Sequence, residues 1–275
     1  MLKVDYSVFT IALNYLISDW LTGKIGSGAP TEPWEIEAVK KVNKLNHVTH
    51  SGSKVELSAD EQFVYDHLVQ IKVLGHLRIV TSHRKWIRGT LEILKTIGIH
   101  VSVALDTLVL RHDLSKFSHK EVLGYAIMFG DGSIDFRQLE NSDDKFEWEN
   151  SLYNHYAHNP HHPEYFYPLQ ADGARVRDRS IMELDPVQGK DFLFESAVDM
   201  LAANGERLLA QDPVIGVKKW FNLSDRFYKR YEAGDGEFVR DEIQHWEMVA
   251  REFLAVEGNQ KKIHGIFDER DIVYS

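Results

Sequence analysis

The feature that most constrains the fold is an apolar helical run that ends in two ionisable residues, His112 and Asp113. Apolar side chains recur before this doublet at helical spacing, at Val101, Ala104, Leu105, Leu108 and Val109. Because positions three and four apart share one helix face, we expect the doublet to extend the buried face of this helix. An imidazole beside a carboxylate is costly to bury unless a partner neutralises the charge and takes the lone pairs. A bound metal ion would do both.

Helical periodicity recurs along the chain, and no alternating strand pattern of any length is visible. We expect helices over about 5–21, 33–46, 58–97, 119–129, 146–157, 192–209, 213–231 and 237–256. Thr31 is expected to cap the second helix, and Gly75 to kink or divide the long third one. Ser58–Glu61 and Ser118–Glu121 have the sequence of capping boxes. The predicted class is all-α, with a long loop over 163–190.

Composition narrows the class of protein. The hydrophobic content of 43% and the charged content of 27% are ordinary for a globular chain of 275 residues. There is no cysteine, so disulfides and thiolate metal sites are excluded. This composition suits a reducing compartment, and we expect a cytoplasmic protein. No apolar stretch approaches the ~20 residues of a membrane span, and residues 1–21 lack the pattern of a signal peptide.

The net charge of −10 argues against a broad nucleic-acid surface or an anionic membrane surface. It leaves room for a small local pocket that binds phosphate. The 14 histidines matter more for their clustering than for their number, because four of them fall between His155 and His162.

Several histidines and one later aspartate are candidate metal ligands. His83 lies three residues after Val80 and four before Ile87, so it points inward. Asp199 has small neighbours that leave room for another helix or a metal. The complete candidate set is His83, His112, Asp113, His155, His158, His161, His162 and Asp199.

Nitrogen and oxygen ligands of this kind suit iron, manganese, zinc or magnesium. One or two divalent ions could activate a water molecule at neutral pH. Lys116 lies three residues after Asp113, close enough to contact a phosphate beside the metal. For Glu164, three roles stay open: a general acid or base, a partner of a ligating histidine, or a surface residue.

At these residues the chain resembles the HD superfamily of metal-dependent phosphohydrolases. His112-Asp113-Leu114-Ser115-Lys116 is similar to the His-Asp-x-x-Lys form of the doublet, and Val198–Ala203 is similar to the helix of the final aspartate. More specifically, the chain is similar to a family of uncharacterised HD-like proteins common in phage and bacterial genomes. The segments that carry this likeness are His83–Ile87, His112–Phe117 and His155–Glu164. It covers about residues 75–210.

The resemblance implies a helical metal site formed by His83, His112, Asp113 and Asp199. In binuclear members further histidines hold a second metal, a role that His155 and either His161 or His162 would fill. The resemblance implies an HD-domain-like helical bundle, which we place over residues 58–210. Outside the likeness, we expect a helical extension over 1–57 and a helical pair over 211–275 that packs on this core. Some binuclear members are di-iron oxygenases.

Each candidate also has a purely structural interpretation. His83 could be a hydrogen-bonded histidine of the core, and His76 could be the metal ligand in its place. The doublet could be a capping or hydrogen-bonding pair, the 155–162 cluster an exposed polar turn, and Lys116 a salt-bridge partner.

The leading hypothesis is a metal-dependent hydrolase in which an activated water attacks a small phosphoester or nucleotide. Lys116 would steady the phosphate, and His155, His161 or His162 would bind a second metal or protonate the leaving group. Among these candidates we assign Lys116, Glu164 and His161 to catalysis, and His155 and His162 to the metal. The alternatives are a di-iron oxygenase on the same ligands and a non-catalytic helical binding protein. We expect a small phosphorylated molecule as partner and no nucleic acid or membrane, and a homodimer formed by the C-terminal helices stays open.

Overall fold

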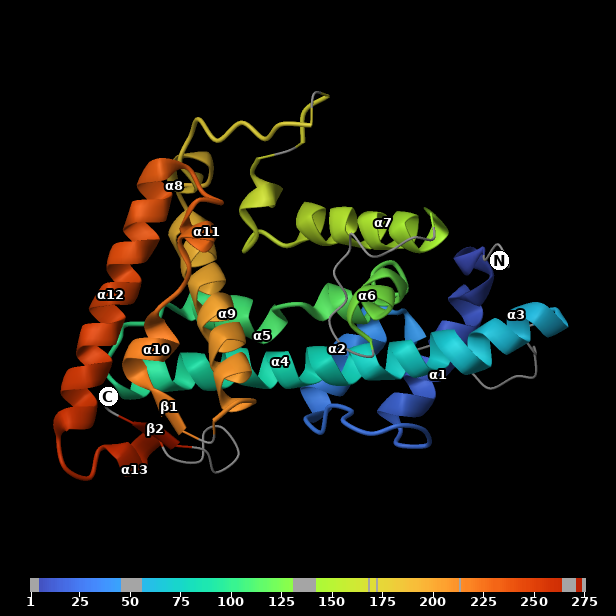
Figure 1. Cartoon of the computed structure of the whole chain (residues 1–275), viewed down its shortest axis with the longest axis horizontal. Helices are drawn as coiled ribbons and strands as arrows, with labels where there is room; N and C mark the ends of the chain where they lie inside the picture. The colour runs from blue at the N-terminus through green and yellow to red at the C-terminus, as the bar shows by residue number, and fades with distance from the viewer. Residues whose placement is uncertain are drawn as a thin grey trace. The chain divides into compact units, whose positions relative to one another are not determined.

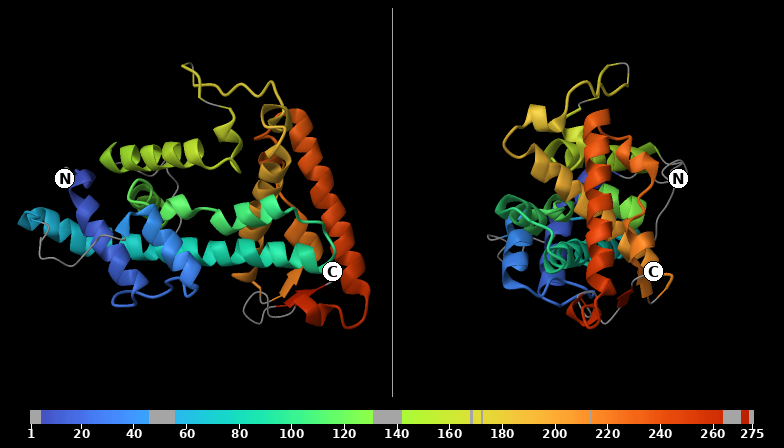
Figure 2. Two further views of the ribbon diagram at one scale, coloured as in Figure 1. Left: turned by 180° about the vertical axis from the view of Figure 1, so that it is seen from behind. Right: turned by 90° about the vertical axis from the view of Figure 1, so that its left-hand side faces the viewer.

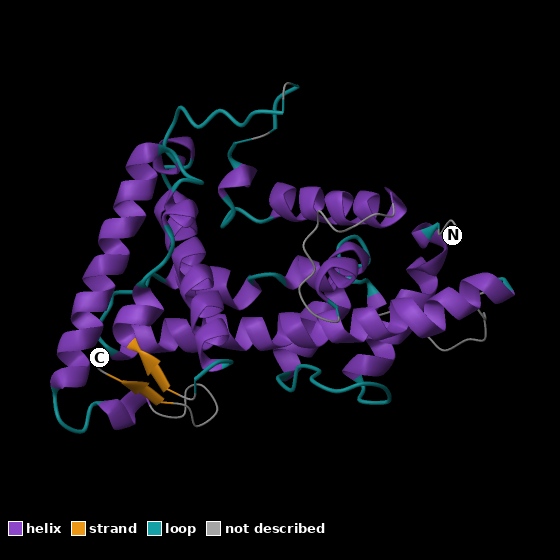
Figure 3. Ribbon diagram, in the orientation of Figure 1, coloured by secondary structure: helices purple, strands orange, loops and turns teal. Residues whose placement is uncertain are grey.

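The computed structural model describes residues 5–45, 56–130, 142–167, 169–171, 173–212, 214–263 and 271–273. Within these ranges helices make up nearly all of the regular structure, so the predicted all-α class is confirmed (Figures 1 and 3). The strands described there are two short segments, β1 (Val214–Gly216) and β2 (Asp271–Val273), which pair in parallel. None of the described helices is long and apolar enough to cross a membrane.

The chain divides into two compact units, each built from two separate segments. Unit 1 consists of Met1–Ser82 and Asp113–His158, and unit 2 of His83–His112 and Asn159–Ser275. This division differs from the three consecutive segments that we expected from the sequence. The His112-Asp113 peptide bond joins the two units, so the two members of the doublet belong to different units.

Unit 1 is an assembly of helices around one hydrophobic core. Its core side chains include Phe9, Trp20, Val73 and Phe117, and the rings of Trp20 and Phe117 stack with centroids 6.1 Å apart. Its elements are η1 (Tyr6–Phe9), α1 (Thr10–Leu21), α2 (Pro33–Val42), α3 (Ala59–Val64), η3 (Tyr65–Val69), the part of α4 (Gln70–Thr96) up to Ser82, η4 (Leu114–Phe117), α6 (Val122–Phe129) and α7 (Ser142–His158).

Glycines allow close backbone contacts in unit 1. A Cβ added to Gly75 of α4 would lie 1.6 Å from the carbonyl oxygen of Gly130, which directly follows α6. Gly75 therefore serves this contact, and α4 continues through it without the break that the sequence led us to expect. A Cβ on Gly124 would lie 2.3 Å from Oγ of Ser151, so α6 and α7 also pack closely, and they lie side by side in Figure 2.

Unit 2 is organised around α9 (Gly189–Leu209). This helix packs against α5 (Val103–Arg111), α8 (Ile181–Leu184), α10 (Val217–Phe221) and α12 (Ala233–Ala255) (Figure 1). Its other elements are the part of α4 from His83, η6 (Pro163–Tyr165), β1, α11 (Asp225–Tyr228), α13 (Gln260–Ile263) and β2.

A buried tryptophan fixes the C-terminal half of α9. Trp220 donates its Nε1 hydrogen to the carbonyl oxygen of Leu201 at 2.8 Å, and Asn204 donates to the carbonyl oxygen of Trp220 at 2.6 Å. A Cβ on Gly205 would lie 2.9 Å from Nε1 of Trp220. These contacts satisfy polar groups inside an apolar core and hold α9 in a fixed orientation within its unit.

Some predicted elements differ from the observed ones. The expected helix over 213–231 is instead β1 followed by the short helices α10 and α11. Helix α2 begins at Pro33 as expected, but its N-cap residue is Glu32 and not Thr31. The Ser58–Glu61 capping box is confirmed.

Candidate metal centre

Helix α9 presents three acidic side chains on one face, Glu195, Asp199 and Glu206. They are separated by four and seven residues, and this spacing brings side chains to the same side of a helix. Glu195 is only 3% exposed, and the side chain of Asp199 is 15% exposed. Buried carboxylates require partners of opposite charge or hydrogen-bond donors, and in unit 2 those partners are histidines.

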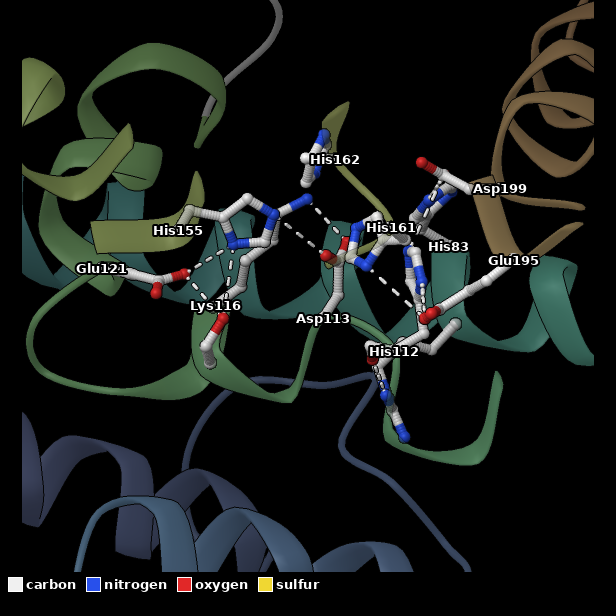
Figure 4. A network of polar contacts seen from close by, with 12 residues as sticks. His83, His112, Asp113, Lys116, Glu121, His155, His161, His162, Glu195 and Asp199 are labelled. Carbon is white, nitrogen blue, oxygen red and sulfur yellow. Dashed lines mark hydrogen bonds and ion pairs between the residues drawn. The ribbon is translucent and has the colours of Figure 1, made fainter. Parts of the chain in front are cut away.

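Three histidines of unit 2 direct their Nδ1 atoms at these glutamates, and Figure 4 shows two of them, His112 and His161, beside Glu195. Nδ1 of His112 lies 3.0 Å from Oε1 of Glu195, and Nδ1 of His161 lies 3.4 Å from the same oxygen. Nδ1 of His83 lies 3.5 Å from Oε2 of Glu206. A carboxylate only accepts hydrogen bonds, so His112 and His161 hold their protons on Nδ1 and keep the lone pair on Nε2. His83 differs, because each of its ring nitrogens faces a carboxylate.

Asp199 is the group that these rings share. Nε2 of His83 lies 2.9 Å from Oδ1 of Asp199, and Nε2 of His112 lies 3.8 Å from the same oxygen (Figure 4). His112, His161 and Asp199 each offer a ligand atom, and these atoms lie within 4.8 Å of one another. The rings of His112 and His161 have centroids 4.1 Å apart. Three imidazoles and one carboxylate thus converge within unit 2.

Both buried acids are held in the ionised form. Burial alone raises the pKa of Glu195, but His161 and the hydrogen bond from His112 outweigh it and lower the pKa to about 2. Burial likewise acts to raise the pKa of Asp199, and the hydrogen bond from His83 together with His112 brings it well below its usual range. Asp199 therefore supplies an anionic oxygen at neutral pH, while Glu195 fixes two rings.

Arg84, buried in α4, positions the backbone of His112. Its guanidinium donates hydrogen bonds to the carbonyl oxygens of His112 and, at 2.9 Å, of Leu110. These carbonyls lie at the C-terminal end of α5, where helical partners are missing. Helix α5 ends at Arg111, and His112 leaves it with an extended ψ of 132°. Both members of the doublet are buried as expected. They do not continue the helical face, because the backbone turns at His112.

Unit 1 contains a second cluster around Asp113 and His155. Asp113 adopts a left-handed backbone with φ of 57°, and its Oδ2 pairs with Nζ of Lys116 at 2.6 Å. Oδ1 of Asp113 lies 3.3 Å from Nε2 of His155. On the other side of that ring, Nδ1 lies 2.9 Å from Oε2 of Glu121 (Figure 4). Burial and the charge of Lys116 lower the pKa of His155.

Glu121 belongs to this cluster and not to a helix cap. The Ser118–Glu121 capping box predicted from the sequence does not form, and α6 begins at Val122 without a side-chain cap. The Glu121 carboxylate instead accepts hydrogen bonds from Oγ of Ser115 at 2.9 Å and from Nδ2 of Asn154 at 2.6 Å. Glu121 is thus a hydrogen-bonding partner of His155.

The remaining candidates lie at the last residue of α7 and on the segment that follows this helix. Glu164 forms an ion pair with Arg230, with Nη2 of the arginine 2.8 Å from Oε2 of the glutamate. Nη2 of Arg230 also contacts Nδ1 of His162 at 3.1 Å. His158 is exposed, and its Nδ1 lies 2.7 Å from the carbonyl oxygen of Asn154. The structure thus gives Glu164 the role of a partner for Arg230.

Four sequence-predicted residues come together within unit 2: His83, His112, His161 and Asp199. Asp113, Lys116 and His155 form the cluster of unit 1. The acids that orient the rings, Glu195, Glu206 and Glu121, and the two arginines, Arg84 and Arg230, were not predicted from the sequence. The spacing of Glu195, Asp199 and Glu206 was a usable signal, because it brings three acids to the helix face on which Asp199 was already a candidate ligand.

The side chains of unit 2 fit a divalent metal ion. Ligating histidines usually donate their other ring N–H to a carboxylate or carbonyl, and all three histidines here have such a carboxylate. Nε2 of His83 and Oδ1 of Asp199 lie 2.9 Å apart, a distance that requires either a proton or a cation between them. Imidazole and carboxylate ligands suit iron, manganese or zinc.

Comparisons with known proteins place this chain in a protein family to which no activity has been assigned. A search of curated proteins finds no match to this chain, and a search of solved structures finds none either. Residues 72–246 match a family of unknown function, DUF5662, and this region holds all the histidines and acids of both clusters. Because the match covers more than half of the 275 residues, the chain belongs to the DUF5662 family.

Proposed function

We propose that the protein is a metal-dependent hydrolase of small phosphoesters or nucleotides. Its divalent ion, iron, manganese or zinc, would be held by His83, His112, His161 and Asp199. The resemblance of the His112–Lys116 segment to the HD phosphohydrolases supports the reaction class. The ligand set alone supports only metal binding.

One observation carries the metal site. Each of the three histidines has Nδ1 directed at a glutamate, 3.0–3.5 Å away, and two of them have Nε2 within 3.8 Å of Asp199. A purely structural histidine needs only one such partner. The repeated arrangement directs Nε2 of His83 and Nε2 of His112 at one carboxylate oxygen of Asp199. Glutamates behind ligating histidines fix the rings in this way in metal sites.

In this proposal the residues of the chain have distinct roles. A bound divalent ion supplies a water of lowered pKa and polarises a phosphoryl oxygen. Glu195 holds His112 and His161 with their protons on Nδ1, and Glu206 does the same for His83. Arg84 fixes the backbone of His112 through its carbonyl oxygen and thereby the position from which the imidazole side chain extends. The anionic Asp199 offsets the charge of the ion.

The roles of the unit 1 cluster stay predictions. Asp113 and His155 are expected ligands from the sequence, and each still has a polar atom directed at the other at 3.3 Å. Lys116 was expected to contact a phosphate, and its ammonium is paired with Asp113. Magnesium and a second ion are further expectations from the sequence.

Metal content and turnover measured on the same protein test the proposal. The purified chain is treated with a chelator, reloaded separately with Mn²⁺, Fe²⁺ and Zn²⁺, and analysed for bound metal. Each form is then assayed against phosphomonoesters, phosphodiesters and nucleotides. His112→Ala is the test variant, and His245→Ala, which alters an exposed histidine of α12, is the matched control.

We expect the wild type and His245→Ala to bind metal and release phosphate or a phosphoester product, and His112→Ala to lose both. Bound iron with an oxygen-dependent product in place of hydrolysis would favour the oxygenase alternative. No bound metal after reloading would overturn the proposal and favour a binding protein.

A further inference from the structure

Two consecutive histidines of unit 2, His161 and His162, have opposite kinds of partner at Nδ1. Nδ1 of His161 faces the carboxylate of Glu195 at 3.4 Å. Nδ1 of His162 faces Nη2 of Arg230 at 3.1 Å. Their rings lie with centroids 4.2 Å apart. The sequence led us to expect a catalytic role for His161 and a metal-binding role for His162, and their partners favour the reverse.

Arg230 is held firmly in place. It forms a two-point pair with Glu164, with Nη2–Oε2 at 2.8 Å and Nε–Oε1 at 3.3 Å. Arg175 donates to the carbonyl oxygens of Glu164 at 3.3 Å and of Tyr167 at 2.5 Å, which ties down the same turn. A two-point pair of this kind fixes the plane of a guanidinium as well as its position.

The charge state of arginine determines the proton position on His162. A guanidinium stays protonated in proteins and has donors only. Nδ1 of His162 must therefore accept the hydrogen bond from Arg230, and the neutral ring carries its proton on Nε2. His161 has the opposite arrangement, because the Glu195 carboxylate can only accept, so its proton lies on Nδ1 and its lone pair on Nε2.

We infer that His161 binds the metal ion, whereas His162 presents an Nε2–H donor to an oxygen of the anionic substrate. Arg230 is the positioning residue that sets this tautomer, and Glu164 orients Arg230. The inference rests on the proposed function and deepens it, because a fixed N–H donor next to a metal ligand, with a guanidinium behind it, suits a phosphoryl oxygen. It also removes His162 from the predicted metal ligands.

The first experiment compares metal binding in two neighbouring variants. Mn²⁺ is titrated into chelator-treated wild type, His161→Gln and His162→Gln, and affinity is measured by calorimetry. We expect His161→Gln to weaken binding by more than about 100-fold, because even residues behind the ligands contribute about 10–100-fold. We expect His162→Gln to leave affinity unchanged and to lower turnover by about 10²–10³-fold, as for the loss of one oxyanion donor. Equal weakening in both variants would overturn the inference.

The second experiment reads the tautomer directly, without turnover. Long-range ¹H–¹⁵N spectra of histidine-labelled protein show which ring nitrogen carries the proton, and His162→Gln assigns the His162 signals. We expect the proton on Nε2 in the wild type and in Arg230→Lys, which keeps a donor-only cation. In Arg230→Met the proton should no longer be confined to Nε2. Circular dichroism verifies that each variant is folded.

The two experiments separate this inference from the proposed function. If the wild type binds no Mn²⁺, Fe²⁺ or Zn²⁺, the proposed function fails, and with it the assignment of a substrate to His162. The spectra still test the role of Arg230 in that case. A proton on Nδ1 of His162 in the wild type would overturn the inference even if the protein binds metal and hydrolyses a phosphoester.

Discussion

In both histidine clusters buried imidazoles lie between carboxylates, but the negative charge of these carboxylates is balanced by different groups. In unit 1, His155 lies between the carboxylates of Glu121 and Asp113, and Lys116 pairs with Asp113 at 2.6 Å. In unit 2, histidines flank Glu195 and Asp199, and the groups that lower the pKa of Asp199 are His83, His112 and His161. Unit 1 thus has a permanent cation of its own, whereas the partners of the unit 2 acids are imidazoles, which carry a charge only when they are protonated.

This difference shows what separates a self-sufficient polar cluster from a ligand site. A lysine beside a buried carboxylate satisfies its charge at every physiological pH. Imidazoles fixed by glutamates satisfy it only when they are protonated, or when a cation lies between their Nε2 atoms and the carboxylate. The variants below test this comparison.

The largest expected effect is on unit 1. Lys116→Met leaves the buried Asp113 carboxylate without its cation, and breaking such a pair costs about 3–5 kcal/mol. We expect a lower midpoint of thermal unfolding by calorimetry, with most of the loss restored in the double variant Lys116→Met, Asp113→Asn. Lys120→Met, at an exposed neighbour, is the control. A stable Lys116→Met protein would mean that Lys116 does not balance Asp113.

The next effect is on metal binding by unit 2. Asp199→Ala removes the only carboxylate of the proposed ligand set, so we expect Mn²⁺ affinity to fall by more than about 100-fold, or about 2.7 kcal/mol. The exposed Asp241→Ala on α12 is the control and should bind as the wild type does. Calorimetric titration measures both. If Asp199→Ala kept the wild-type affinity, Asp199 would not be a ligand.

A smaller effect is expected from the acids that orient the rings. Glu195→Gln keeps the proposed ligands but weakens the acceptor at Nδ1 of His112 and His161, so Mn²⁺ affinity should fall by about 10–100-fold. The corresponding change in unit 1, Glu121→Gln, tests whether His155 takes part. An effect in Glu195→Gln alone would confine the ion to unit 2, and no effect in Glu195→Gln would contradict the assigned role of Glu195.

The smallest effect is on the pH dependence of stability. His76 is buried in unit 1 and stacks on Tyr125 with centroids 5.6 Å apart. Burial and the charge of Lys116 lower the pKa of His76 to about 3, from the ~6.5 of an unfolded chain. The folded state therefore binds fewer protons than the unfolded state below pH ~6.5. The free energy of unfolding consequently decreases as the pH is lowered, by about 1 kcal/mol from pH ~6.5 to ~5.5.

Chelator-treated His76→Phe should lack this contribution and show a correspondingly flatter pH profile of stability. Denaturant unfolding at several pH values measures the profile, and His67→Phe, at an exposed histidine of the same unit, is the control. Identical profiles for the wild type and His76→Phe would show that His76 is not a buried neutral group.

The sequence predicted correctly those features that depend on residues only a few positions apart. The Ser58–Glu61 box formed as expected, because its hydrogen bonds connect groups three residues apart. The Ser118–Glu121 box did not form, because Asn154 and His155 compete for the same carboxylate from another helix. The helix expected over 213–231 was broken for a related reason: part of its first segment pairs as β1 with the distant β2.

The sequence by itself determined the all-α class, the doublet and the residue types of a polar interior site. Helical periodicity and ligand chemistry are properties of short segments, and they need no long-range information. Only the tertiary structure decided which histidine faces which acid. It placed His112 and Asp113 in different units, brought Glu195 to His112 and His161, and gave His162 an arginine where its neighbour has a glutamate. The proton position on an imidazole depends on its partner in space, and spacing along the chain does not encode that partner.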